Sequence, residues 1–169
     1  LGATWMLGAN TSHLSDNAHA LQNHLSADMM HDALRSDVLM SLVAGDPAFG
    51  VSYEEVKSEA TAHSIELNER VAANGNLVEG ASQAALAAVA QPLADYVALA
   101  QKIIDLAGTD PTTARAQLSL FQEKFESLET AMAEVSAAID AESQRTEADS
   151  HGEAVRFGPL AFSVNRRAY

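Results

Sequence analysis

The sequence contains no cysteine, and this absence removes a whole set of chemistries. Without thiols the chain has no disulfide, no thiolate nucleophile, no cysteine-ligated zinc and no covalently attached haem. The absence does not indicate a compartment, because cysteine-free proteins occur on both sides of a membrane.

Aromatic residues are also scarce. They make up 5% of the 169 residues, although hydrophobic residues make up 47%, and many of the latter are alanine. Strands favour branched and aromatic side chains, whereas alanine has the highest helix propensity. The composition therefore favours long, slim helices over a sheet, and the length suits one domain with a continuous core.

Basic residues are few: 10 lysines and arginines stand against 23 acidic residues, which gives a formal net charge of −13. Nucleic acids and anionic membrane surfaces select basic faces, so neither is an expected partner. The acidic residues are spread along the chain rather than gathered in a block, which is typical of a solvated surface.

Long hydrophobic runs are missing too, since no stretch reaches the ~20 apolar residues that span a bilayer. The first nine residues (LGATWMLGA) are nevertheless apolar and uncharged, and they contain Trp5, the only tryptophan. Two interpretations stay open. The segment is the outer end of a membrane-spanning helix with Trp5 in the interfacial belt, or it is an ordinary buried helix end.

What the chain does contain is helical periodicity. Apolar residues that recur every three or four positions predict four helices, at about residues 11–44, 53–73, 77–107 and 111–149. Glycine, proline and asparagine clusters near residues 45–47, 74–76 and 108–111 separate them. Ser52 with Glu55 forms a predicted capping box, and Asp110 followed by Pro111 is a predicted start of the last helix.

The apolar series predict which face of each helix is buried. In the first helix we expect Leu14, Ala18, Leu21 and Leu25 and then, after a change of phase, Met30, Leu34, Val38 and Leu42. The second and third series are Tyr53, Val56, Ala60, His63, Leu67 and Val71, and Leu86, Val89, Leu93, Tyr96, Ala100 and Ile103. The last series is Leu118, Phe121, Phe125, Leu128, Met132, Val135 and Ile139. Its regular spacing indicates coiled-coil-like packing, and Pro92 predicts a kink in the third helix.

Short connections make neighbouring helices antiparallel. The sequence therefore predicts an all-α, antiparallel up-down-up-down four-helix bundle with long first and fourth helices, each about 55 Å long. Both free ends then lie at the same pole. The bundle is expected to cover residues 1–150, and residues 151–169, where the pattern dissolves, are expected to be a non-bundle extension or tail.

This layout, together with the stretch Met29–Leu39 (MMHDALRSDVL), resembles the four-helix-bundle sensor domain of methyl-accepting chemotaxis proteins. The likeness covers residues 10–149 in layout and only this stretch in its residues. It implies the homodimeric periplasmic domain of an inner-membrane receptor, flanked by two membrane spans outside this sequence. Such a domain binds a small molecule and passes displacements of its last helix to a cytoplasmic signalling rod. Sensor histidine kinases share the module, so the output domain stays open.

Charged residues interrupt the first helix. Continuing its early apolar series without a change of phase places Asp28, Asp32 and Arg35 at core positions. Buried charges need a partner, water or a ligand. Alternatively, the change of phase turns them outward, and Asp32 with Arg35 is then an exposed pair.

The expected register gathers polar residues at one height. Folding the second helix back places His63 opposite about residue 33, near His31 and Arg35, and Tyr96 and Gln122 fall at the same level. These five residues are the predicted ligand-binding site, with Arg35 making a forked contact to a small carboxylate. Alternatively, His63 and Tyr96 are simply core residues.

Motifs for other chemistry are absent or incomplete. His24, Asp28 and His31 share one stripe that suits a metal, but a di-iron bundle needs paired Glu-x-x-His motifs, and Asp28-x-x-His31 stands alone. Phosphate loops, nucleophile elbows and zinc-protease motifs are not found. We therefore expect no enzyme, catalytic residue, cofactor or dedicated metal site. Besides the sensor, a structural or protein-interaction bundle and a metal-binding bundle remain as alternatives.

Overall fold

The computed structural model describes the backbone of residues 2–157 and the side chains of residues 15–148. Its elements are α1 (Gly2–Ser41), α2 (Tyr53–Ala73), a 3-10 turn η1 (Asn74–Asn76), α3 (Gly80–Ala107), α4 (Pro111–Ala116) and α5 (Leu118–Phe157). No strand occurs in the described part of the chain, so the predicted all-helical class is confirmed.

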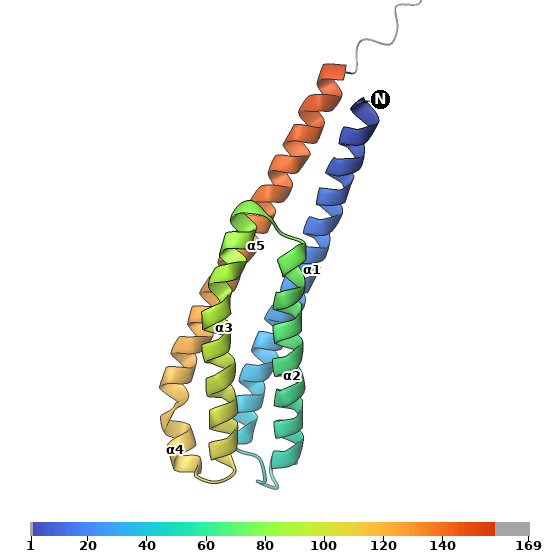
Figure 1. Ribbon diagram of the computed structural model, residues 1–169. Helices are drawn as coiled ribbons and strands as arrows, with labels where there is room; N and C mark the ends of the chain where they lie inside the picture. Colours follow the sequence, from blue (N-terminus) through green and yellow to red (C-terminus); the bar gives the residue numbers. More distant parts are fainter. Residues whose placement is uncertain (1, 158–169) are drawn as a thin grey trace, which may run out of the picture.

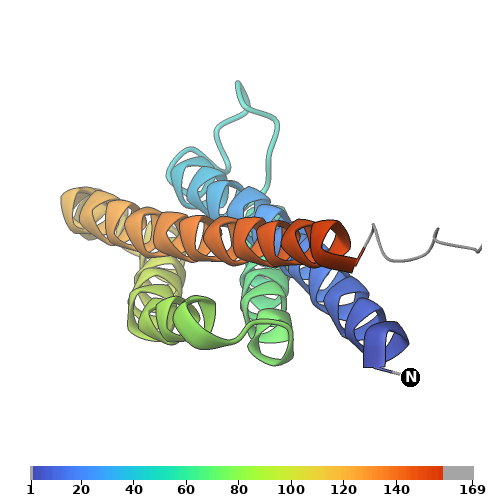
Figure 2. The ribbon, with the colours of Figure 1, turned by 90° about the horizontal axis from the view of Figure 1, so that it is seen from above.

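Two long helices dominate the molecule. α1 and α5 each contain 40 residues, whereas α2 has 21 and α3 has 28. The start of α1 and the end of α5 lie at the same end of the molecule and extend beyond the connection between α2 and α3 (Figure 1). The view from above shows that α1 and α5 are inclined to each other (Figure 2).

The predicted fourth helix is two helices. Asp110 caps α4 as expected, because its side chain accepts a hydrogen bond from the Thr113 N–H at 3.1 Å, and Pro111 follows at the first helical position. However, the Gln117 N–H bonds the carbonyl of Ala114, only three residues back, at 3.1 Å. This tighter turn ends α4 and offsets it from α5, so the prediction of one continuous helix from residue 111 was wrong.

The predicted buried face of α1 was wrong in its first half. Between residues 15 and 41 the buried stripe of α1 keeps a single spacing of three and four, with Asp37 buried beside it: Ala20, His24, Ala27, His31, Leu34, Val38 and Ser41. The side chain of Leu14, also predicted to be buried, lies outside the described residues. Leu25, expected in the core, is 57% exposed. Most residues of the buried stripe are small or polar. A search for large apolar residues therefore does not find this stripe.

The other helices bury most of the residues that their patterns predict, whereas five residues of those series are only partly buried: Tyr53, His63, Val71, Leu86 and Leu118. In α2, Val56, Ala60 and Leu67 are buried. In α3 the buried side chains include Val89, Leu93, Tyr96, Ala100 and Ile103, and in α5 they include Phe121, Phe125, Leu128, Met132, Val135 and Ile139. Pro92 lies within α3, which continues on both sides of it. The predicted capping box is confirmed, since Ser52 and Glu55 each bond the backbone N–H of the other at 3.0–3.2 Å.

The ends of the chain are described only in part. Helix α5 continues past residue 150 to Phe157, and the rest of the predicted tail, residues 158–169, lies outside the described residues. The side chain of Trp5 also lies outside them, so neither interpretation of the first nine residues is tested. Among the described helices, none is both long enough and apolar enough to cross a membrane.

A close contact at Gly108 gives the first testable prediction. A Cβ atom there would lie 2.7 Å from Cζ of Tyr53, whose hydroxyl donates a hydrogen bond to the carbonyl of Ile104 at 2.7 Å. Gly108→Ala should therefore displace the Tyr53 ring and lower the free energy of unfolding by about 1–3 kcal/mol. Urea unfolding measures this change. Gly75→Ala is the matched control, because no atom lies within 4 Å of its added Cβ; equal losses in both variants would contradict the steric explanation.

Candidate functional site

Four of the five predicted site residues meet at one level of α1, α3 and α5. Arg35 Nη2 donates a hydrogen bond to Gln122 Oε1 at 3.2 Å. The Tyr96 hydroxyl donates to the backbone carbonyl of His31 at 2.8 Å. The expected register between these three helices is therefore correct to within a turn, although ligand binding by these residues stays a prediction.

Aromatic rings fill this level. The His31 ring stacks on Phe125 with centroids 4.1 Å apart and meets the edge of Tyr96 at 4.8 Å, and Phe121 stacks on Tyr96 at 5.2 Å. Cζ of Arg35 lies 4.4 Å from the centre of the Phe125 ring. We call His31, Arg35, Tyr96, Phe121, Gln122 and Phe125 together the aromatic layer. It is a packed contact between three helices, with His31 1% and Tyr96 0% exposed.

Burial disfavours the charged form of the His31 imidazole. Burial lowers the pKa of its imidazole below the usual value, with Arg35 adding to the decrease and the carboxylates of Asp32 and Asp28 opposing it. Its Nε2 atom is buried and has no hydrogen-bond partner among the described residues. An imidazolium at this position would bring an unpaired charge into the aromatic layer, which is costly.

His63 lies elsewhere from the other predicted site residues. Its Nδ1 atom is 2.7 Å from Oδ2 of Asp37, one turn further along α1 than the expected neighbour at residue 33. Burial raises the pKa of the Asp37 carboxyl, and the hydrogen bond with His63 opposes that rise. The register between α1 and α2 was therefore shifted by a turn, and Asp37 is the partner that sequence reasoning missed.

The residues of the metal alternative do not form a ligand set. His24 and His31 are buried in the α1 stripe, but Asp28 between them is exposed. Within the described part of the chain, no group of three or more histidines and carboxylates lies close enough to hold one metal ion. The geometry thus adds no support to a metal-binding bundle.

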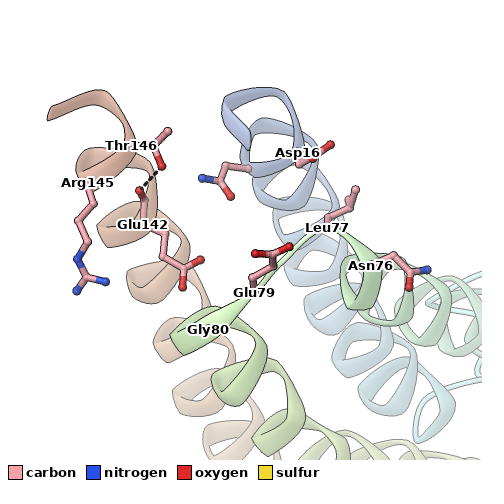
Figure 3. Close-up of a pocket in the computed structure, with 9 residues that line it drawn as sticks. Asp16, Asn76, Leu77, Glu79, Gly80, Glu142, Arg145 and Thr146 are labelled. Carbon is pink, nitrogen blue, oxygen red and sulfur yellow. Dashed lines mark hydrogen bonds between the residues drawn. The ribbon is translucent and has the colours of Figure 1, made fainter. Parts of the chain in front are cut away.

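A cavity of about 390 Å³ opens where the α2–α3 connection meets α1 and α5 (Figure 3). It lies well away from the aromatic layer along α1 and α5. The residues that line it are Asp16 and Asn17 of α1, Asn76, Leu77, Glu79 and Gly80 around the connection, and Glu142, Arg145 and Thr146 of α5. Sequence reasoning missed this cavity, since only the fold brings these three segments together.

One wall of the cavity is held rigidly. Glu142 of α5 accepts a hydrogen bond from the Ser82 N–H at 3.1 Å and another from the Ser82 hydroxyl at 2.7 Å. It thereby caps α3, whose own N-cap residue Glu79 makes no such bond. Gly80 adopts a positive φ of +52°, and a Cβ on it would lie 3.3 Å from a Glu142 carboxylate oxygen. The close approach and the two donors fix the position of this carboxylate.

A smaller cavity of about 210 Å³ lies between α2 and α3. Lys57 and Asp105 line it and form an ion pair with each other at 2.7 Å. Because Lys57 and Asp105 already neutralise each other, neither is an unpaired charge that a ligand could bind.

Comparison with protein-family models, with curated proteins and with solved structures found no match to this chain. The class that the structure establishes is an all-helical protein, with five α-helices in the described part of the chain, of which α1 and α5 are the longest. Any function must therefore be argued from the geometry of this chain.

Proposed function

We propose that the chain is the ligand-sensing domain of a bacterial chemoreceptor and that it carries out no catalysis. The observation that supports this most is that the start of α1 and the end of α5 lie at the same end of the molecule (Figure 1). In this proposal two membrane spans continue from that end and the domain lies in the periplasm. The helices then form an up-down-up-down four-helix bundle, with α4 as the first part of the fourth rod.

The proposed signal is a small displacement of α5 against α1. The aromatic layer joins these helices through the Arg35–Gln122 hydrogen bond and the stacking of His31 on Phe125. Packed interfaces of this kind change between discrete arrangements rather than deform continuously. A ligand shifts the balance only if it binds one arrangement more tightly than the other.

Arg35 is the proposed contact for a carboxylate ligand. Its hydrogen-bond partner, Gln122, is neutral, and among the described residues the guanidinium has no carboxylate within ion-pair distance. In the arrangement described here the rings of the layer fill the level. A carboxylate would therefore bind the second arrangement, in which Gln122 has moved away from Arg35 and His31, Tyr96 and, beyond them, His63 line the opening.

Dimerisation with a second copy is also part of the proposal. Leu25 and Met29 follow each other on one face of α1 and are 57% and 67% exposed. Large apolar side chains at a spacing of four are suited to helix–helix contact. A sensor domain of a histidine kinase shares each of these features and remains the second candidate.

Two introduced cysteines test the proposal, because the native chain has none. Spin labels at Gln22→Cys on α1 and Glu134→Cys on α5, both exposed positions, report the distance between the helices. A panel of organic acids and amino acids is screened by thermal shift, and the distance is measured with each stabilising compound. We expect the distance distribution to change with the ligand, and the change to be lost in Arg35→Ala. The sensor proposal fails if stabilising compounds leave the distance unchanged.

A retained effect in Arg35→Ala would have a narrower meaning. Binding that is equally strong in the variant and the native chain would remove Arg35 from the proposed site without affecting the displacement mechanism. Ser36→Ala is the matched control, since Ser36 follows Arg35 on α1 and is exposed.

A further inference from the structure

The aromatic layer buries a side chain that can take up a proton. His31 is 1% exposed, and its Nε2 atom is buried with no hydrogen-bond partner among the described residues. Buried polar side-chain atoms usually have a partner, so an unpaired ring nitrogen in the core needs an explanation. An apolar side chain would fill the same space without the cost of burying a polar atom. The imidazole at this position therefore points to a role beyond packing.

The immediate surroundings of His31 disfavour a positive charge. Its ring stacks on Phe125 with the centroids 4.1 Å apart and meets the edge of Tyr96 at 4.8 Å. The guanidinium of Arg35 already lies against the same Phe125 ring, with its Cζ atom 4.4 Å from the ring centre. An imidazolium would be a second cation against that ring, and its Nε2 N–H would have no acceptor. Both effects hold only while the layer is closed.

The charges on α1 itself act in both directions. Burial lowers the pKa of the His31 imidazole, and the carboxylates of Asp32 and Asp28 oppose this decrease. Arg35 adds to the decrease. Asp28 and Asp32 are exposed and belong to the same helix as His31, so they remain close to it when the layer opens. The effect of burial, in contrast, is lost when water reaches the ring.

The neighbouring helices supply no counter-charge from the groups that face this level. On α3, burial raises the pKa of Tyr96, so its hydroxyl is neutral, and that hydroxyl donates to the backbone carbonyl of His31 at 2.8 Å. On α5, the side chain of Gln122 is neutral. Three further carboxylates around this level already have a partner: Asp95 has Lys124, Asp37 has His63, and Glu126 has Gln122.

A buried base of this kind couples proton uptake to a change of arrangement. In an open arrangement, where water reaches His31, its pKa is close to the ordinary value of 6.5, and in the closed layer it is lower. The arrangement with the higher pKa is the one that a bound proton favours. Between the two pKa values, each fall of one pH unit therefore shifts the balance toward the open arrangement by up to about tenfold.

We propose that acid opens the aromatic layer: when His31 takes up a proton, its ring leaves Phe125 and Tyr96, and α5 moves away from α1. The inference rests on the proposed displacement of α5 against α1, and it adds the proton as a stimulus of the domain. The side chains that respond are already in contact with both long helices, so no additional element is needed to pass the change on.

Spin labels at Gln22→Cys on α1 and Glu134→Cys on α5 test the proposal without any added ligand. The distance between them is measured from pH 7.5 to pH 5.5, and circular dichroism follows the helices over the same range. We expect a second, longer distance whose population rises by up to about tenfold for each pH unit below 6.5, with the helical signal retained. An unchanged distance overturns the proposal. Loss of the helical signal also overturns it, because acid would then unfold the domain.

Two variants assign the response to one histidine. In His31→Phe, which keeps a ring against Phe125 but does not titrate, the longer distance should not appear at any of these pH values. His24→Phe is the matched control, since His24 is the other buried histidine of α1 and lies outside the aromatic layer. It should respond as the native chain does. A response that persists in His31→Phe, or is lost in His24→Phe, contradicts the assignment.

Histidine NMR of the native chain gives a measurement that does not depend on how well a variant folds. The Cε1–H signal of His31 should titrate at a lower pH than that of the exposed His19. Its midpoint should coincide with the midpoint of the distance change. Different midpoints would mean that another group drives the movement, and the proposal would be wrong.

The outcomes are distinct from those of the ligand test. A distance that changes with pH but not with organic acids or amino acids would leave the response of His31 intact and count against carboxylate sensing. A distance that changes with such a ligand but not with pH would do the reverse.

Discussion

Tyr96→Ala will lower the free energy of unfolding by about 3–5 kcal/mol, the cost of removing a large buried aromatic side chain. Tyr96 is 0% exposed and lies between α1 and α5, with Phe121 stacked on its ring and the His31 and Phe125 rings in edge contact. Its removal leaves a cavity at the level where α1, α3 and α5 meet through aromatic rings. Chemical denaturation followed by circular dichroism measures the loss.

Tyr96→Phe separates packing from hydrogen bonding. This variant keeps the ring and removes only the hydroxyl, which donates to the His31 carbonyl at 2.8 Å. The expected loss is about 1 kcal/mol, the typical contribution of one such bond. If Tyr96→Phe lowered the free energy of unfolding as much as Tyr96→Ala, the hydrogen bond would be the main stabilising contact of Tyr96. Our account of the aromatic layer as ring packing would then be wrong.

Acidification from pH 7.5 to 5.5 will destabilise the fold. Burial lowers the pKa of both His24 and His31 below the ordinary value of 6.5. Well above pH 6.5 both are neutral in the folded and in the unfolded chain, so neither makes the stability depend on pH. As the pH falls through 6.5 the unfolded chain takes up protons first. Stability then decreases by at most about 1.4 kcal/mol per pH unit for each histidine, until the folded-state pKa is reached.

Two histidine variants test whether the pH dependence of stability comes from the buried His31. His31→Phe keeps a ring against Phe125 but does not titrate, so its stability should fall less steeply with pH than that of the native chain. His19→Gln is the control, because His19 is exposed on the same helix. Asp37 acts in the opposite direction, since burial raises its pKa from 3.8 and its ionisation costs stability as the pH rises. That contribution is the same in all three proteins. Identical slopes in His31→Phe and the native chain would contradict the role of His31.

Most of the fold was readable from periodicity, and the exceptions have a common cause. The stripes of α2, α3 and α5 consist mainly of large apolar residues, so their buried faces follow directly from the spacing. The stripe of α1 includes four small or polar residues: Ala20, His24, Ala27 and His31. Such side chains also occur on exposed helix faces, so they give no apolar signal in the sequence. Leu21 and Leu25 next to it gave the stronger apolar signal, although Leu25 is exposed.

The candidate sites divide in the same way. The level of Tyr96 and Gln122 relative to His31 and Arg35 followed from helix lengths and short connections. The partner of His63 did not, because the loop of residues 42–52 sets the height of α2. In that loop Gly45 has a φ of +86° and its N–H bonds the carbonyl of Val51 at 2.9 Å. A difference of one turn in such a loop replaces one partner with another.

By itself, the sequence determined that this protein is helical, where α2 begins and ends, where α3 ends and α4 begins, and most of the buried faces of α2, α3 and α5. These properties depend on propensity, capping and spacing within one segment. Only the tertiary structure decided that α1 buries His24 and His31 and that Asp37 faces His63. It also decided that Asp16, Glu79 and Glu142 surround one cavity. Contacts between distant segments depend on how far each connection shifts one helix along another, and no local pattern encodes that shift.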